Sequence, residues 1–265
     1  MEASTINPKL GEFGHEHGLI NRAVSALYGA GADSDFWAAL ATDPIFARRV
    51  YEFFLARKNC TEPKQAARIM GSNMHGLGPA RRHFVREIDR TRFRVVPFRT
   101  ETLDACRDSH VLVAVTALSV DDIEAIAPKW GYQPGSGNNP EHSWLFLAHE
   151  KNASVRPTPG WYLIRKQAVG LGKTFDEATA LLGPAEFVPS LAVLVQAMLL
   201  HFHETGGRLY HDTHVWASDI APPHYTSREL PSSISIWEKG LHVSVWSGEK
   251  HPTHGLASAV KWETE

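Results

Sequence analysis

The order of the secondary-structure elements along the chain is the strongest constraint on its fold. Helical periodicity dominates the first hundred residues, whereas short strand-like segments gather near the C-terminal end. Between these two parts, an apolar strand over 110–118 (HVLVAVTAL) precedes a helix that Ser119 caps. A doubly wound parallel sheet would alternate strand and helix to the end of the chain. The order therefore predicts an α+β protein.

The same pattern divides the chain into two predicted parts. We expect residues 1–107 to form a mainly helical N-terminal region and residues 108–265 to form a mixed domain. A long apolar helix begins near Pro189 and ends at Gly206. The strands that follow it are short and separated by Pro and Gly loops, and they are predicted at 214–217, 234–237, 241–246 and 256–262.

Composition and charge exclude several classes of protein. A hydrophobic content of 43% with 21% charged residues is that of an ordinary globular protein, and a net charge of −2 argues against coating nucleic acid by bulk charge. The two cysteines, Cys60 and Cys106, are too few for a disulfide scaffold and favour a reducing compartment. The apolar stretches are shorter than the roughly 20 residues of a membrane span. We expect a soluble, cytoplasmic protein that makes no contact with a membrane.

Histidines are concentrated from the end of the long helix onward, which raises the alternative of a metal-dependent hydrolase. Two imidazoles at positions i and i+4 share a helix face, but His201 and His203 are two residues apart and point away from each other. A metal site would require several members of this histidine cluster to converge: His201, His203, His211, His214 and His224. We expect no metal and no cofactor, and the hydrolase remains an alternative.

Motifs for other enzymatic chemistry are absent from the sequence. No serine lies in a G-x-S-x-G elbow. The segment GLGKT (170–174) lacks the first glycine of a P-loop, because Gln167 stands at that position. A protein without catalytic activity is therefore favoured.

An arginine-rich segment offers a second alternative. Residues 81–99 contain seven arginines, and together with a helix predicted over 61–71 they resemble a helix-turn-helix arrangement. Arginines such as Arg81, Arg82, Arg86 and Arg90 would then contact phosphates. A solvated helix face or a surface that docks another protein explains the same pattern, so nucleic-acid binding stays an alternative.

The segment SSISIWEKGLHVSVWS (232–247) is predicted to form a β-hairpin with two different faces. Alternation places aliphatic residues on one face of the two strands. The other face carries hydroxyl groups, one imidazole and two indoles, which are contributed by Ser233, Ser235, Trp237, His242, Ser244 and Trp246. Rigid indoles beside adaptable hydroxyls are typical of recognition surfaces. A second layer of the same protein covering both indoles would explain the pattern equally well, and both interpretations stay open.

Several stretches from residue 68 onward resemble a group of uncharacterised bacterial proteins. The matching stretches are IMGSNMHG (69–76), LDACRDSHVLVAVTALSVDDI (103–123), GWYLIRK (160–166), TGGRLY (205–210), WASD (216–219), GLHVSVW (240–246) and GLASAVK (255–261). The C-terminal half of that group resembles the C-type-lectin-like fold of formylglycine-generating-enzyme-like domains and of the variable proteins of diversity-generating retroelements. The resemblance implies a lectin-like domain in residues 108–265.

In the variable proteins, the diversified residues lie in the segments that match 232–237 and 241–254. The resemblance therefore implies that the six hairpin residues contact a ligand, and it adds the loop residues Glu249, His251 and His254. No cysteine follows Cys106, so the oxidase activity of the formylglycine-generating enzymes is not implied. We expect a non-enzymatic binding protein that presents this strand-and-loop surface to a protein or carbohydrate ligand.

Overall fold

The structure is a computed structural model, in which the chain divides into two compact units, Met1–Leu55 and Ala56–Glu265. For the strand residues 230–233, 235–237 and 240–245 it describes the backbone. The described residues are 24–25, 27–29, 31–48, 50, 59–84, 88–130, 133–134, 143–144, 153–221, 230–237, 240–245 and 249–262.

The first unit is helical in its described part. Helix α2 (Ser34–Thr42) begins where the Asp33 carboxylate accepts a hydrogen bond from the amide of Phe36 at 2.9 Å. The ring of Phe36 contacts Trp37 and Phe46 edge-on, with centroid distances of 5.2 and 5.6 Å. None of the residues of α2 is fully buried.

The second unit contains two main sheets. The strands of the first sheet are, in spatial order, β1 (Met74–His75), β2 (His110–Val115), β5 (Gly160–Arg165), β11 (Ala259–Val260) and β6 (Glu186–Phe187). Those of the second are β10 (His254–Leu256), β7 (His214–Ala221), β8 (Leu230–Trp237) and β9 (Gly240–Val245). A small third sheet pairs β3 (Gln133–Pro134) with β4 (Ser143–Trp144). Helices and mixed sheets together confirm the predicted α+β class.

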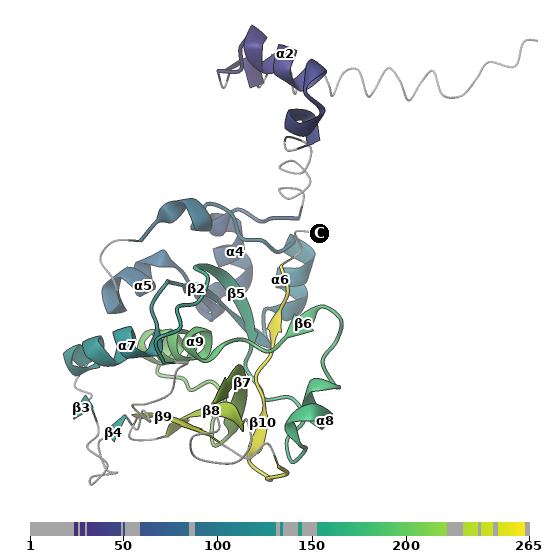
Figure 1. Ribbon diagram of the computed structural model, residues 1–265. Coiled ribbons are helices and arrows are strands. Elements are labelled where there is room, and N and C mark those ends of the chain that lie inside the picture. Colours follow the sequence, from purple (N-terminus) through teal and green to yellow (C-terminus); the bar gives the residue numbers. More distant parts are fainter. Residues whose placement is uncertain are drawn as a thin grey trace, which may run out of the picture. The chain divides into compact units, whose positions relative to one another are not determined.

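Helix α9 (Leu191–Thr205) lies between the two main sheets, where it contacts β2 on one side and β7 and β8 on the other (Figure 1). Its first ten residues, Leu191–Leu200, are all buried, as expected of a helix that is apolar on every face. Ser190 is its N-cap residue, and the amide of Leu191 donates to the carboxylate of Asp219 on β7. The helix ends at Gly206, whose left-handed backbone (φ 70°) suits a glycine.

Strand alternation sorts the buried residues of the second unit into layers. On β2, Val111, Val113 and Val115 face the core that contains α9, whereas Leu112 and Ala114 face a second core. Residues of α4 (Pro63–Met70) and α6 (Thr100–Cys106) pack in that second core. The remaining helices that the structure describes here are η1 (Gly71–Asn73), α5 (Leu77–His83), η2 (Arg90–Phe93), α7 (Val120–Ile126), η3 (Ala127–Trp130) and α8 (Phe175–Thr179).

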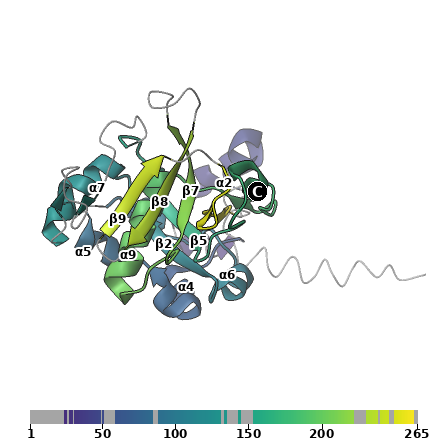
Figure 2. The ribbon, with the colours of Figure 1, turned by 90° about the horizontal axis from the view of Figure 1, so that it is seen from below.

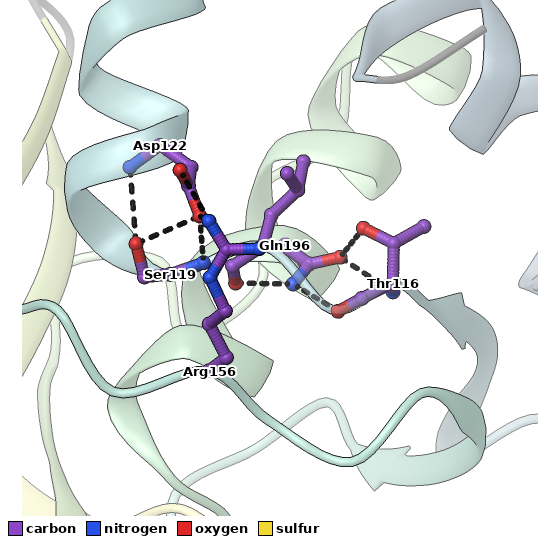
Figure 3. Close-up of polar contacts among 6 residues, drawn as sticks. Thr116, Ser119, Asp122, Arg156 and Gln196 are labelled. Atoms are coloured by element: carbon purple, nitrogen blue, oxygen red, sulfur yellow. Dashed lines mark hydrogen bonds and ion pairs between the residues drawn. The ribbon is translucent and has the colours of Figure 1, made fainter. Parts of the chain in front are cut away.

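A buried glutamine holds α9 against the end of β2 (Figure 3). The Oε1 atom of Gln196 accepts hydrogen bonds from the backbone amide and the hydroxyl of Thr116, both at 2.8 Å. Its Nε2 atom donates to the carbonyls of Thr116 and Leu118 at 3.0 and 3.1 Å. Three of these bonds join the Gln196 side chain to the backbone of Thr116 and Leu118, and the fourth joins it to the Thr116 hydroxyl, so together they fix the position of the helix relative to the sheet.

The next helix begins beside this turn. Ser119 and Asp122 form a capping box at the start of α7, which confirms Ser119 as the predicted cap (Figure 3). Arg156 donates to the Asp122 carboxylate at 3.1 Å. The cap therefore also joins α7 to the segment that precedes β5.

The last residues of the unit pass from one sheet to the other. The predicted single strand over 256–262 is in fact two short strands, because β10 pairs with β7 and β11 pairs with β5 and β6. The buried turn at Ala257 and Ser258 joins them, and the amide of Arg165 donates to the Ser258 carbonyl at 3.0 Å. The two sheets therefore meet at this corner, and α9 fills the space where they diverge.

The predicted division at residue 107 lies inside the second unit. Strand β1 pairs with β2, and α4 and α6 pack on the same sheet, so residues 56–107 belong to the fold that the later residues build. Within the described part of the chain, none of the helices combines the length and the apolar character needed to cross a membrane.

Candidate functional site

The register of β8 and β9 separates aliphatic positions from polar ones. Ile234 lies opposite Val243, and Ile236 lies opposite Leu241. The alternating pairs are Ser233 with Ser244 and Ser235 with His242. Directly opposed residues occupy the same face of a sheet. The predicted segregation of the two sets is therefore present in the backbone pairing.

The buried position of Ile234 identifies the face that belongs to the core. Ile234 is 0% exposed and packs in the core around α9, as does Val215, its partner on β7. Figure 2 views the second sheet from its other side, which we call the outer face. There β7, β8 and β9 lie in front of α9 and the first sheet, and no helix of the described residues crosses in front of β8 and β9.

Two rows of residues cross the outer face from β10 to β9. The first row is fully paired: Leu256 with Trp216, Trp216 with Ser233, and Ser233 with Ser244. In the second row His254 pairs with His214, and the same register places Ser235 opposite His214 and His242 opposite Ser235. Three of the four positions in the second row are therefore histidines.

The first row changes from apolar to polar between β7 and β8. Trp216 is fully buried and contacts Phe175 of α8 edge-on, with ring centroids 5.9 Å apart. Leu256 and Ala178 belong to the same small cluster. Helix α8 thus covers the outer face over β7 and β10, and the serine positions begin one strand further on.

The histidine end of the second row is closely packed. The rings of His214 and His254 stack with centroids 4.6 Å apart and an interplanar angle of 4°. His251 meets His254 edge-on, and their Nδ1 atoms are 3.0 Å apart. Burial lowers the pKa of His254 to about 4, with the neighbouring His214 and His251 acting in the same direction. At neutral pH this imidazole is uncharged, and it offers hydrogen bonds rather than charge.

The nine predicted site residues lie in different parts of the second unit, and not all of them are described. Ser233, Ser235, Trp237, His242 and Ser244 lie in β8 and β9, where the backbone is described, and Trp246 lies outside the described residues. Glu249 is exposed and His251 is half-buried beside the sheet. His254 was predicted in a loop, which is wrong: it lies in β10, paired with β7 and 2% exposed, because the chain re-enters the sheet there.

The histidines of the hydrolase alternative separate into different pairs. His201 contacts His75, His203 stacks on His83, and His214 stacks on His254. His211 is exposed and pairs with Asp212, and His224 lies outside the described residues. Among the described residues, no group of three or more His, Cys, Asp or Glu side chains is placed to hold a metal ion.

Sequence reasoning missed His75 and His83, the partners that come from the N-terminal side of the second unit. They lie more than a hundred residues before α9, and no spacing rule joins them to it. Only the pairing of β1 with β2 brings them to the end of the helix.

The arginines of the nucleic-acid alternative are distributed over two elements. Arg81 and Arg82 lie on α5, and Arg90 and Arg92 lie on η2, whereas Arg86 lies outside the described residues. Between α4 and α5 the chain forms η1 and β1, and β1 joins the sheet. The short turn of a helix-turn-helix is therefore not present here.

Comparisons of the chain with protein-family models, with curated proteins and with solved structures found no match.

Proposed function

We propose that the chain is a non-enzymatic binding protein, and that the outer face of β8 and β9 contacts a protein or carbohydrate ligand. The observation that carries this proposal is the register of the hairpin, which pairs Ser233 with Ser244 and Ser235 with His242 on the face opposite the buried Ile234. The exposed Glu249 and the half-buried His251 extend the surface beyond the strands.

The chemistry of these positions suits a polar ligand with flat apolar surfaces. Serine hydroxyls both donate and accept hydrogen bonds, and the ring nitrogens of an imidazole can do either, so they match the hydroxyls of a sugar or the backbone of a peptide. Trp237, the last residue of β8, and Trp246, which follows β9 in the sequence, would add large, rigid stacking surfaces. Together, these residues supply both the polar and the apolar part of a recognition surface.

The scaffold separates stability from recognition. The inner residues of the sheet pack on α9, so the outer residues can vary without disturbing the core. That separation is what the resemblance to C-type-lectin-like variable proteins implies, and we extend the proposal to that fold. We also propose a cytoplasmic setting, which fits Cys60 and Cys106, since the two form no disulfide.

The proposal is tested with an array of immobilised oligosaccharides and a phage-displayed peptide library. Wild type and two variants are compared, Ser235→Arg on the outer face and Ser72→Arg on η1, which is exposed elsewhere on the unit. We expect wild type and S72R to select the same ligands, and S235R to lose them. Selection of those ligands by S235R at unchanged affinity would contradict the proposal.

A further inference from the structure

Two imidazoles join β1 to the C-terminal end of α9. The Nε2 atom of His75 lies 2.9 Å from the Nδ1 atom of His201, and the rings meet edge-on with centroids 5.1 Å apart. One nitrogen of such a pair must donate a proton while the other accepts it. The contact therefore exists only while at least one of the two imidazoles is neutral.

The surroundings of this pair disfavour two positive charges more strongly than they compensate for them. His75 is only 1% exposed, and Lys166, which follows β5, adds a positive charge that faces both rings. Glu204 on α9 is the nearby acid, but its two oxygens are already bound by Arg82 at 2.6 Å and by His83 at 2.8 Å.

A second imidazole pair lies next to the first. His83 on α5 stacks on His203 of α9, with ring centroids 4.8 Å apart and an interplanar angle of 15°. Burial and the adjacent His83 lower the pKa of His203. Both histidine pairs thus connect the same two parts of the chain, β1–α5 and the last turns of α9.

Besides the imidazoles, the ion pair of Arg82 with Glu204 and several apolar contacts hold β1 and α5 in place. The apolar contacts are made with the two cores by Met74, Leu77, Ala80 and Phe84. Strand β1 is at the edge of its sheet, and its register with β2 comprises two pairs, Met74 with Leu112 and His75 with Val113. Helix α5 is seven residues long and buries Ala80. A short edge strand and a short helix form the kind of segment that opens locally before the rest of a domain unfolds.

We propose that β1 and α5 form an acid-sensitive latch on the end of α9, which is closed while His75 and His201 are neutral and opens when they take up protons. Opening would detach residues 74–83 from α9 and leave the central helix and the sheets folded. The latch includes β1 of the first sheet, whereas the proposed ligand surface lies on β8 and β9 of the second sheet. The latch is therefore independent of the proposed ligand surface.

The sign and size of the effect follow from proton linkage. Burial lowers the pKa of each imidazole from 6.5 to about 4 in the closed state. Opening hydrates the imidazoles and restores the ordinary value, so the open state binds more protons below pH 6.5. Closure is fully favoured above that pH and is lost progressively between pH 6.5 and 4. At pH 5, the equilibrium constant for opening is about thirtyfold larger for each imidazole that becomes hydrated than it would be without protonation.

The latch is tested by hydrogen exchange of the whole chain, measured by mass spectrometry between pH 7.5 and pH 5 and corrected for intrinsic exchange rates. The test variant is His75→Gln with His201→Asn, in which the two amides replace the nitrogens that meet and do not titrate. His211→Asn is the control, because His211 is exposed and pairs with Asp212 instead. Should the double variant differ from wild type in circular dichroism at pH 7.5, His75→Gln alone replaces it.

We expect the protection of residues 74–83 to fall at least thirtyfold in wild type and in H211N, while β5 keeps its protection. In H75Q/H201N, and in H75Q alone, the protection of residues 74–83 should fall at least tenfold less than in wild type, and the remaining fall comes from the imidazoles that are left, His203 among them. Constant protection of residues 74–83 in wild type would overturn the latch. Loss of protection to the same extent in H75Q/H201N would overturn it as well.

Discussion

Trp216 on β7 lies directly opposite Ser233 on β8, and the boundary between a covered and a polar part of the outer face runs between them. The indole of Trp216 is fully buried under α8, whereas the next position in the row after Ser233 is Ser244. Helix α8 therefore covers this row at β10 and β7. The residues of β8 and β9 beyond this boundary are the ones for which we propose a role in recognition.

Lysine substitutions at neighbouring positions of β8 distinguish the two faces. Ile234→Lys places a charge in the core around α9 and should lower the free energy of unfolding by more than about 4 kcal/mol. Ser235→Lys, one residue further on, should change it by less than about 1 kcal/mol. Urea denaturation at pH 7.5 measures both. Similar losses for the two variants would show that the outer face is covered at Ser235.

Removal of the Gln196 side-chain amide should lower the free energy of unfolding, because this amide joins α9 to the end of β2. Gln196→Leu has nearly the same volume, but it leaves the amide and carbonyl of Thr116 and the carbonyl of Leu118 without their partner. We expect a loss of about 3 kcal/mol or more in the free energy of unfolding. Gln65→Leu on the exposed side of α4 is the control and should change it by less than about 0.5 kcal/mol. A loss below 1 kcal/mol for Q196L would contradict the role of this bond network.

The stability of the protein should decrease as the pH falls from 7 to 5. Burial lowers the pKa of His110 to about 4, so the unfolded chain, with a pKa near 6.5, binds the proton first and unfolding is favoured below that pH. His110→Asn removes this proton and keeps a polar group beside Ser109, whose hydroxyl is 2.8 Å from the His110 Nδ1 atom.

The measurement is urea denaturation of wild type and H110N at pH 7 and pH 5. The fall in unfolding free energy should be smaller in H110N by on the order of 1–2 kcal/mol. Equal falls in the two proteins would mean that His110 is already hydrated in the folded state.

A glycine in β10 allows the chain to pass close to the segment after β5. A Cβ atom at Gly255 would lie 2.8 Å from the Cβ of Ala168 and 3.0 Å from the carbonyl oxygen of Val169. Gly255→Ala should therefore displace β10 and cost about 2–3 kcal/mol of unfolding free energy. Adding Ala168→Gly removes one of the two clashes and should restore part of the loss. An unchanged midpoint of thermal unfolding in G255A would contradict this packing.

Local patterns in the sequence predicted the elements that depend on local chemistry. Ser119 is a cap, Gly206 ends α9, and the aliphatic alternation of β8 and β9 anticipates their pairing, because each of these features is written in a few consecutive residues. Contacts between distant segments were not predictable in this way. The pairing of His75 with His201 spans 126 residues, and the strand position of His254 depends on β7, so neither leaves a local signal.

Substitution of Trp237 and Trp246 tests the central claim most directly. Affinity for a ligand selected by wild type, from the oligosaccharide array or the peptide library, is measured for Trp237→Ala/Trp246→Ala together with its free energy of unfolding. We predict that the double variant loses binding while its circular dichroism spectrum stays nearly unchanged. A loss above about 3 kcal/mol in unfolding free energy for either single substitution would place that indole in the core. That result, or undiminished binding by the double variant, would contradict the proposed recognition surface.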